Sequence, residues 1–314
     1  MYNGVINVYK ERGFTSFDVV AKLRGILKQK KIGHTGTLDP EAEGVLVVCL
    51  GKATKLCDVL TDKDKRYEAT LLLGKRTDTE DSTGKVLSES DVTVCEEQVR
   101  EAILSYVGEY DQIPPMYSAI KVNGKKLYEL AREGIEIERK PRKVVIHEIQ
   151  ILSMQLPYVT FQVSCSKGTY IRSLCRDIGE KLGCGAIMDG LIRDCVNATE
   201  TGKVFTKEDA LTLNQIEELV KTQQLEEQVL SIDSMFPKMA KIKVTEEGNK
   251  KLYNGNLLKN MDFERSESDG YTFFAASDIG DGTECLVYDK EGCFTAIYKY
   301  YAGLRAWKAE KMFL

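Results

Sequence analysis

The side chain best placed for chemistry is Asp39, which stands in a glycine-rich loop running from Gly33 to Gly44. Glycines let a backbone approach a ligand closely, and Pro40 restricts Asp39 to an extended conformation. A small carboxylate held in this way is a candidate nucleophile. An Asp-Pro pair also caps helices, but Gly44 would end such a helix within one turn. The loop lacks the pattern of a phosphate-binding P-loop.

Two further stretches carry side chains that suit a catalytic site. In Cys165–Leu174 a strand end meets a helix start, and Tyr170 and Arg172 fall in the first turn, where side chains can project into a cleft. Arginine is a natural partner for a catalytic aspartate, because it lowers the carboxylate pKa and fixes the carboxylate geometry. In Asp64–Ala69, Tyr67 is either half-buried strand packing or a stacking platform for an unstacked base.

The elements that position these residues are short and of mixed type. Apolar alternation and helical periodicity predict the following elements. The expected strands are 4–8, 44–50, 65–73, 117–122, 144–152, 158–165 and 191–198, and the expected helices are 15–30, 96–107, 125–132, 170–182 and 216–230. Thr15 and Asp18 predict a capping box at the first helix. The strands do not alternate regularly with helices, so the fold class is α/β (α+β) with a mixed, largely antiparallel sheet.

The chain changes character after Pro237. Short strands alternate with turn signals there, at Asn254-Gly255, Ser268-Asp269-Gly270, Asp281-Gly282 and Glu291-Gly292. This pattern predicts a small β-rich domain over 237–314, after a larger domain over 1–236.

Composition narrows the class of protein. The 314 residues carry a net charge of -4, and no apolar run is as long as a membrane span. The N-terminus has no signal-peptide pattern, so we expect a soluble cytoplasmic protein without a membrane partner. The nine cysteines form no C-x-x-C pair and are expected to be reduced, and with two histidines we expect no metal site.

The charge is distributed unevenly along the chain. Five basic and no acidic residues lie between Asp18 and Asp39, and eight basic residues face four acidic ones over 121–143. Local basic faces of this kind are compatible with RNA, because attraction depends on the field at the contact surface.

Five motifs occur together and in order, and they carry a family resemblance. They are Gly33–Pro40, Asp64–Tyr67, Leu73–Thr79, Pro114–Ala119 and Lys167–Arg172. The chain resembles the bacterial TruB family, the tRNA pseudouridine-55 synthases, over nearly its whole length. Two positions depart from the family pattern: Lys10 is followed by Glu11 rather than proline, and Ile192 stands where many members have the first of two arginines.

The resemblance implies a fold and a set of roles. It implies a pseudouridine synthase catalytic domain and a PUA-like RNA-binding C-terminal domain. The implied site residues are Asp39 as the catalytic aspartate, Arg172 as its partner, Tyr67 stacked on the target uracil, Tyr170 as the active-site tyrosine, Leu191 lining the uridine pocket and His34 packing into the RNA near the flipped base. It also implies that the basic stretch 116–143 closes on the T loop. The local excess of positive charge in that stretch predicts phosphate contacts from Lys121, Lys125, Lys126 and Arg132.

The implied reaction breaks the N1–C1′ bond of a flipped uridine, turns the uracil and joins C5 to C1′. Asp39 either attacks C1′ or assists removal of the C2′ proton, and the sequence does not choose between these routes. We expect no cofactor, no obligatory protein partner and a monomer that acts on the T arm of tRNA. The alternatives are a hydrolase that uses Asp39 with Glu41 or Glu43, a guide-RNA-dependent relative, and a tRNA-folding or RNA-binding protein with dispensable catalysis.

Overall fold

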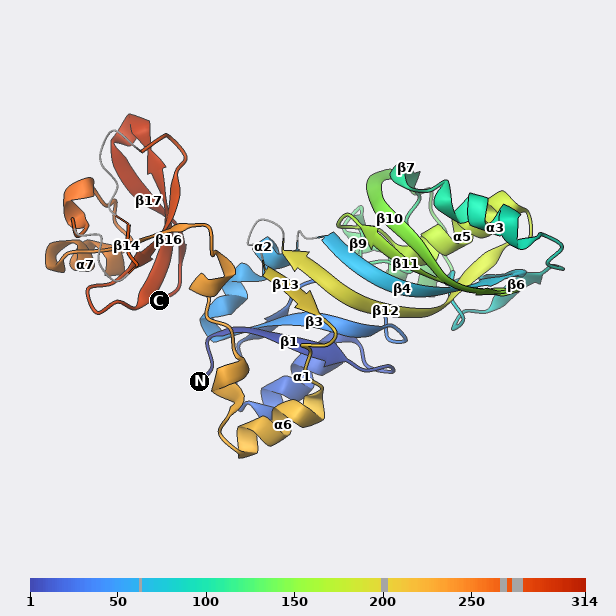
Figure 1. Ribbon diagram of the computed structural model, residues 1–314, viewed down its shortest axis with the longest axis horizontal. Coiled ribbons are helices and arrows are strands. Elements are labelled where there is room, and N and C mark those ends of the chain that lie inside the picture. Colours follow the sequence, from blue (N-terminus) through green and yellow to red (C-terminus); the bar gives the residue numbers. More distant parts are fainter. Residues whose placement is uncertain (62–63, 199–202, 266–269, 273–278) are drawn as a thin grey trace.

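The computed structural model describes residues 1–61, 64–198, 203–265, 270–272 and 279–314, and one large sheet organises most of them (Figure 1). Within these residues nine strands pair in the order β1-β3-β12-β4-β11-β10-β7, with β2 added to β3 and β13 to β12. The strands are β1 (Gly4–Lys10), β2 (Ile32–His34), β3 (Glu43–Leu50), β4 (Asp64–Leu73), β7 (Gly108–Gln112), β10 (Arg142–Gln155), β11 (Tyr158–Cys165), β12 (Ala186–Ala198) and β13 (Lys203–Thr206). The pairing of β12 with β3 is parallel and the other pairs are antiparallel. The expected mixed, largely antiparallel sheet is therefore confirmed.

Helices cover two separate parts of this sheet. The helices are α1 (Ser16–Ile26), α2 (Cys57–Thr61), α3 (Glu96–Leu104), α4 (Leu127–Arg132), α5 (Ile171–Leu182), α6 (Leu213–Lys221) and α7 (Glu246–Tyr253). One apolar cluster joins α1 and α6 to β1 and β3, and it includes Leu23, Val48 and Ile216. Another joins α3 and α5 to β4 and β11, and it includes Ile103 and Phe161. Figure 1 shows these two pairs of helices at different ends of the sheet.

Several element boundaries differ from the sequence-based expectation. The capping box of Thr15 and Asp18 is confirmed, but α1 ends at Ile26 rather than near residue 30. The helix expected over 216–230 was wrong in its second half, because α6 ends at Lys221. Gln223 then adopts a φ of 59°, which a continuing helix does not allow, and the following turn is the short helix η2 (Leu225–Gln228). The apolar residues after α6 therefore do not form one helical stripe: Leu225 packs in the cluster around α1 and α6, whereas Leu230 packs against the cluster that contains Val5 and Val45.

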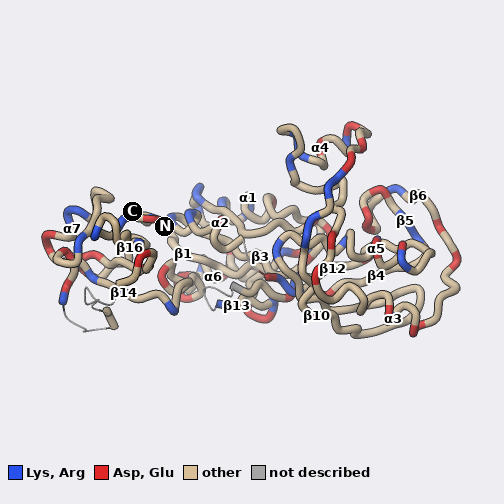
Figure 2. Tube along the Cα trace, turned by 90° about the horizontal axis from the view of Figure 1, so that it is seen from above, with Lys and Arg blue, Asp and Glu red and all other residues tan. Residues whose placement is uncertain are grey.

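The basic segment forms an arm that stands out from the sheet (Figure 2). It carries the two-residue strands β8 (Lys121–Val122) and β9 (Lys125–Lys126), followed by α4. Of the strand expected over 117–122, only the last two residues form a strand, β8. The expected Asn123-Gly124 turn is present, with positive φ at both residues, as a tight hairpin requires.

The C-terminal part builds a second sheet of its own, in the order β14-β15-β16-β17. Its strands are β14 (Ala240–Lys243), β15 (Glu284–Tyr288), β16 (Phe294–Tyr301) and β17 (Ala306–Met312). The helix α7 was not expected in this segment. Leu286 and Phe313 share an apolar cluster with Val5 and Val45, so this cluster links the second sheet to the first. The division at residues 236 and 237 stays a prediction.

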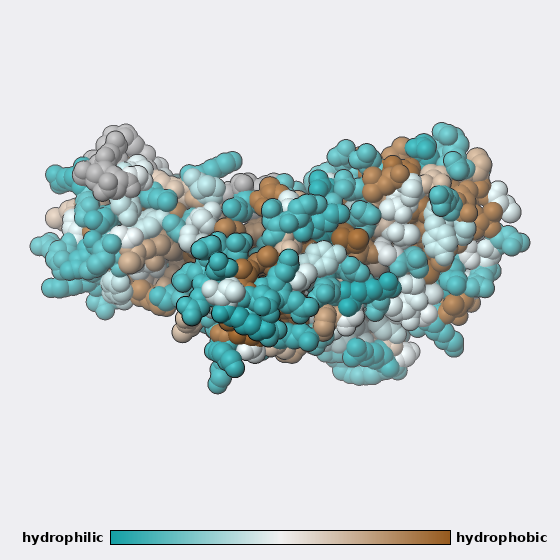
Figure 3. Space-filling model, turned by 60° about the horizontal axis from the view of Figure 1, so that its bottom comes forward, coloured by the Kyte–Doolittle hydropathy of each residue, from teal (hydrophilic) through white to brown (hydrophobic). Residues whose placement is uncertain are grey.

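A two-stranded ribbon, β5 (Lys75–Thr77) with β6 (Val86–Glu89), completes the described strands. The face of the molecule in Figure 3 is largely hydrophilic, with separate hydrophobic patches. None of the helices in the described residues is long and apolar enough to cross a membrane.

Candidate active site

The loop that carries Asp39 lies between β2 and β3 and begins no helix, so its residues are free for another role. Its backbone is held from one side by the end of β1 and the start of α1. The Ser16 hydroxyl accepts a hydrogen bond from the Leu38 amide (2.9 Å) and donates to the Leu38 carbonyl (3.3 Å). The buried Lys10 ammonium donates to the Pro40 carbonyl (3.0 Å). Asp39 is therefore flanked on both sides by tethered peptide groups.

Arg193 holds the same loop from the other side. This buried residue of β12 donates from Nε to the Val45 carbonyl (2.7 Å) and from Nη2 to the Gly36 carbonyl (3.1 Å). Its backbone lies against Gly44, where a Cβ would be 2.2 Å from the Arg193 carbonyl oxygen. The glycine at residue 44 thus permits the parallel contact between β3 and β12.

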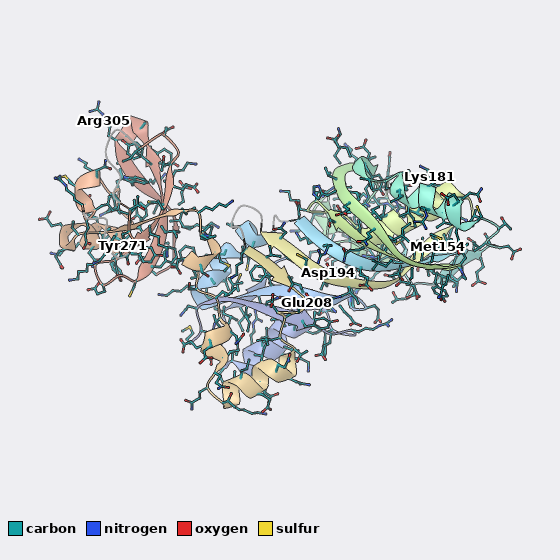
Figure 4. The ribbon with its side chains drawn as sticks, in the orientation of Figure 1. Met154, Lys181, Asp194, Glu208, Tyr271 and Arg305 are labelled. Carbon is teal, nitrogen blue, oxygen red and sulfur yellow. The ribbon has the colours of Figure 1, made fainter. Side chains whose placement is uncertain are left out.

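The next residue along β12, Asp194, secures the strand on its other side. Figure 4 labels it near the middle of the sheet. Its carboxylate accepts two hydrogen bonds from Arg66 Nε (3.1 and 3.0 Å) and one from Gln162 (2.9 Å). The central strands β12, β4 and β11 are thereby cross-linked beside the loop.

Arg172 forms an ion pair with Asp39. Its Nε lies 3.0 Å from Asp39 Oδ2, and its Nη2 lies 3.2 Å from Oδ1. The guanidinium also donates to the carbonyls of Thr79 (3.1 Å) and Tyr117 (2.9 Å), and Asp81 lies 3.7 Å from it. The Arg172 side chain is only 6% exposed while that of Asp39 is 38% exposed, so the buried arginine orients a carboxylate that solvent or substrate can reach.

The pKa of Asp39 reflects both the cations near it and its burial. Arg172 and Lys10 lower the pKa of Asp39, as expected for cations, but burial is the larger effect and the pKa lies above its ordinary value. The expected lowering by arginine is thus present, but burial outweighs it and sets the net direction of the shift. Burial also lowers the pKa of Lys10 to about 8, although the carboxylates nearby oppose the shift.

Asp39 opens onto a pocket of about 220 Å³. The other lining residues come from three segments: Pro40, Glu41 and Ala42; Asp81, Ser82 and Thr83; and Met188, Asp189, Gly190 and Leu191. This volume is below the roughly 300 Å³ at which sites for drug-sized ligands begin, so it suits one small ring. Of the residues expected for the pseudouridine synthase, the pocket brings together Asp39 and Leu191, and it also contains Glu41, a candidate of the hydrolase alternative.

The two predicted tyrosines lie close to Asp39 but do not line this pocket. Tyr67 of β4 is buried, and burial raises its pKa while the neighbouring Arg193 opposes that shift. Tyr170 precedes α5, and the Gln112 side chain clamps its backbone through two hydrogen bonds (2.8 and 3.0 Å). The charge of Asp39 acts on both phenols. The structure thus gathers both tyrosines and Arg172 around the aspartate.

The remaining predicted residues lie apart from the pocket. His34 ends β2, its pKa is lowered by burial and by Arg193, and its buried Nδ1 has no hydrogen-bond partner within the described residues. The four predicted phosphate-binding residues Lys121, Lys125, Lys126 and Arg132 all lie on the arm. Lys125 there pairs with Glu133 (3.4 Å). No three His, Cys, Asp or Glu side chains in the described residues gather as metal ligands.

Sequence reasoning missed Ser16, Lys10 and Arg193, which hold the loop. The available signal was a cation inside an otherwise apolar strand pattern, as at Lys10 after Val8 and at Arg193 after Leu191 and Ile192. A buried cation needs hydrogen-bond partners, and here those partners are the carbonyls of the catalytic loop.

The chain is similar to family models and to proteins of known function. The chain matches the model of the TruB family pseudouridylate synthase N-terminal domain over residues 24–171 and that of the tRNA pseudouridylate synthase B C-terminal domain over residues 172–237. It is 56% identical to tRNA pseudouridine synthase B of Lachnoclostridium phytofermentans, over 99% of this chain and 100% of that one. It is 49% identical to the protein of the same name from Alkaliphilus oremlandii, over 82% of this chain and 83% of that one.

Among solved structures, the chain is similar to one described as a Cbf5-Nop10-Gar1 complex, with a TM-score of 0.69 and 25% identity over 99% of this chain and 85% of that one. A structure of an H/ACA RNP bound to a substrate RNA gives a TM-score of 0.66 at 23% identity, over 99% of this chain and 85% of that one, and supports the fold alone. The match to both family models and the high identity over whole chains lead to one assignment: the chain belongs to the TruB family of pseudouridylate synthases.

Proposed function

We propose that this TruB-family enzyme isomerises uridine to pseudouridine in tRNA, at position 55 in the T loop. The observation that carries the proposal is the Asp39–Arg172 ion pair at a pocket that suits one small ring. The target base lies within folded RNA, so it must leave the stack to reach this pocket.

In the proposed reaction the N1–C1′ bond breaks, the uracil turns, C5 bonds to C1′ and the C5 hydrogen leaves as a proton. Asp39 either attacks C1′ or takes the C2′ proton to give a glycal. Both routes need the ionised carboxylate, and Arg172 favours that form against the effect of burial. Exclusion of water keeps the detached uracil from being lost by hydrolysis.

The other predicted residues hold the RNA. Tyr67 stacks on the uracil, Tyr170 and Leu191 form walls around it, and His34 packs into the RNA beside the flipped nucleotide. The arm that carries α4 closes on the T loop through Lys121, Lys125, Lys126 and Arg132, and residues 237–314 provide a second RNA-binding domain. We further propose that the protein acts in the cytoplasm as a monomer, without a cofactor or an obligatory protein partner.

The alternative hypothesis of a hydrolase needs Glu41 or Glu43 as a second carboxylate, and the contacts of both residues weaken it. Glu41 is paired with Arg12 (2.6 Å), and Glu43 accepts a hydrogen bond from the Tyr9 hydroxyl (3.0 Å). Glu41 lines the pocket with Asp39 but its carboxylate is held by Arg12, and Glu43 does not line the pocket, so neither offers the unengaged second carboxylate that glycoside hydrolysis uses. The guide-RNA-dependent alternative is not favoured, because identity is 56% to a tRNA pseudouridine synthase B and 25% to Cbf5.

The test uses tRNA that carries 5-fluorouridine at position 55. Fluorine does not leave C5 as a cation, so an isomerase rearranges the nucleotide and stalls as an enzyme adduct or a hydrated, non-aromatic product. A hydrolase releases 5-fluorouracil, and a binding protein leaves the RNA unaltered. Mass spectrometry of the recovered nucleotide separates these outcomes. Intact 5-fluorouridine after long incubation with enzyme that is active on normal tRNA would overturn the mechanism.

Mapping pseudouridine in tRNA from cells that lack the protein tests the position. Loss of the modification at residue 55 alone is the expected result. If pseudouridine were retained at position 55 and lost at another site, the assignment to position 55 would be rejected, whereas the assignment as an isomerase would stand.

A further inference from the structure

Phe17 is a large aromatic residue whose side chain is left in solvent at the start of α1. It is 64% exposed, although the helix buries Val19, Val20 and Leu23 against the sheet. The Arg24 guanidinium lies 5.9 Å from the centre of the Phe17 ring, which leaves much of that ring accessible. The cation lies over one face of the ring, so the other face of this exposed phenyl ring is available for a nucleic-acid base to stack on.

The chain that follows Phe17, through α1 and the segment after it, is strongly basic. Lys22, Arg24, Lys28, Lys30 and Lys31 are all exposed. Within the described residues none of the five pairs with a carboxylate, and no acidic residue lies between Asp18 and Asp39. Exposed cations without an ion-pair partner attract a polyanion, because little of their charge is neutralised by the protein itself.

The position of α1 relates this surface to the catalytic loop. Ser16, the neighbour of Phe17, is hydrogen-bonded to the backbone of Leu38, which precedes Asp39. In Figure 2 α1 lies along the same edge of the molecule as the arm with α4, whereas α6 lies toward the other edge. Phe17 therefore directly follows a residue that is hydrogen-bonded to the catalytic loop.

We propose that Phe17, Arg24 and Lys28 form a second RNA-binding surface, on which an unpaired nucleotide of the substrate stacks on Phe17 while the two cations bind phosphates. The proposal rests on the proposed function, since it assigns this surface to the same RNA. The exposed positions between these residues include the small residues Ala21 and Gly25, which let a strand approach the helix closely. A membrane is a poor occupant, because the apolar face of α1 is already buried and Phe17 alone projects.

Binding to full-length tRNA tests the stacking contact. Dissociation constants are measured in an Asp39→Asn background, so that no turnover occurs. Phe17→Ala is expected to raise Kd roughly tenfold, the loss of one base–aromatic stack. Phe17→Trp is expected to keep Kd near the parent value, because it preserves a stacking ring. Tyr158→Ala is the matched control, since Tyr158 is an exposed aromatic on β11, close to the Met154 labelled in Figure 4.

Fluorescence gives a direct readout of stacking. The single tryptophan, Trp307, is 1% exposed in the C-terminal sheet. Emission of Phe17→Trp is expected to be quenched on addition of a T-arm RNA, while that of the parent protein stays unchanged. Arg24→Gln is expected to lower the salt dependence of binding by about one phosphate contact, whereas Phe17→Ala leaves that slope unchanged.

An unaltered Kd for Phe17→Ala, or an unquenched tryptophan at residue 17, would overturn the proposal and leave the surface to a protein partner. Failure of the proposed function gives a different result: the protein without substitutions then forms no pseudouridine in tRNA. Thermal unfolding of each variant confirms that the exposed substitutions leave the fold intact.

Discussion

Arg172 meets Asp39 with one edge of its guanidinium, Nε to Oδ2 at 3.0 Å and Nη2 to Oδ1 at 3.2 Å. The same guanidinium is fixed by the carbonyls of Thr79 and Tyr117. The orientation of the carboxylate thus depends on four chain segments, whereas its charge depends on one proton. Substitutions can separate these two properties.

Asp39→Asn removes the charge and keeps the shape. We expect isomerisation to fall by more than about a hundredfold, because the amide neither attacks C1′ nor takes a proton. Binding of tRNA is expected to be no weaker, since a negative charge near RNA is lost. Release of tritium from C5-labelled uridine in tRNA measures turnover. Asp111→Asn, an exposed aspartate of β7, is the control, and near-normal turnover by Asp39→Asn would reject the assignment.

The pH dependence of the reaction reports the balance of charge at Asp39. Its pKa lies above 3.8 because burial outweighs Arg172, so the acid limb of the single-turnover rate is expected above that pH. Arg172→Gln removes the largest lowering contribution and is expected to move this limb to higher pH, and Arg172→Lys to move it less. Melting of the tRNA at each pH is the control. A limb that shifts to lower pH in Arg172→Gln would contradict this balance.

The raised pKa of Asp39 also makes the free energy of unfolding depend on pH. Folded protein binds a proton at Asp39 more readily than unfolded chain does. Between 3.8 and the folded pKa the contribution of Asp39 to the free energy of unfolding therefore falls as pH rises, and below 3.8 that contribution is fully present. Comparing acid unfolding of the native protein with that of Asp39→Asn isolates this contribution. A contribution that grows with rising pH in this window would show that the folded pKa is depressed instead.

The arm supplies exposed cations for phosphate contacts. Lys121→Gln combined with Arg132→Gln is expected to weaken tRNA binding and to lower the salt slope by about two. Lys85→Gln combined with Lys221→Gln removes the same charge from elsewhere and is the control. An unchanged slope in the arm variant would mean that the RNA does not contact the arm through these residues.

Gly44 tests the contact between β3 and β12. Gly44 and Gly13 both have positive φ, 103° and 85°, but a Cβ at Gly44 meets Arg193 backbone at 2.2 Å whereas at Gly13 it meets nothing within 4 Å. Gly13→Ala is expected to lower the free energy of unfolding by about 1 kcal/mol from conformational strain, and Gly44→Ala by clearly more. Denaturant unfolding measures both. Equal losses would show that β3 and β12 separate without cost.

Those parts of the site that are encoded in short sequence motifs could be predicted from the sequence. Asp39, Tyr170 and Arg172 stand in short motifs, and the strand that holds Tyr67 alternates clearly. The tethers on the loop could not be predicted, because Lys10 and Arg193 find their acceptors only through strand pairing across distant parts of the chain. The net direction of the Asp39 pKa depends on burial, which motif spacing does not report. The early end of α6 depends on the left-handed backbone at Gln223, a residue type with no strong turn preference.

The joint between β3 and β12 also has a consequence for the order of assembly. It is parallel and spans only two registered pairs, Ile192 with Glu43 and Arg193 with Gly44, whereas β12 pairs with β4 over most of its length. Asp39 belongs to the part of the sheet on one side of this joint, and Arg172 belongs to the part on the other side. Either part folding alone holds half of the catalytic pair. During refolding, activity is therefore expected to return only with this long-range closure, later than the secondary structure of both parts.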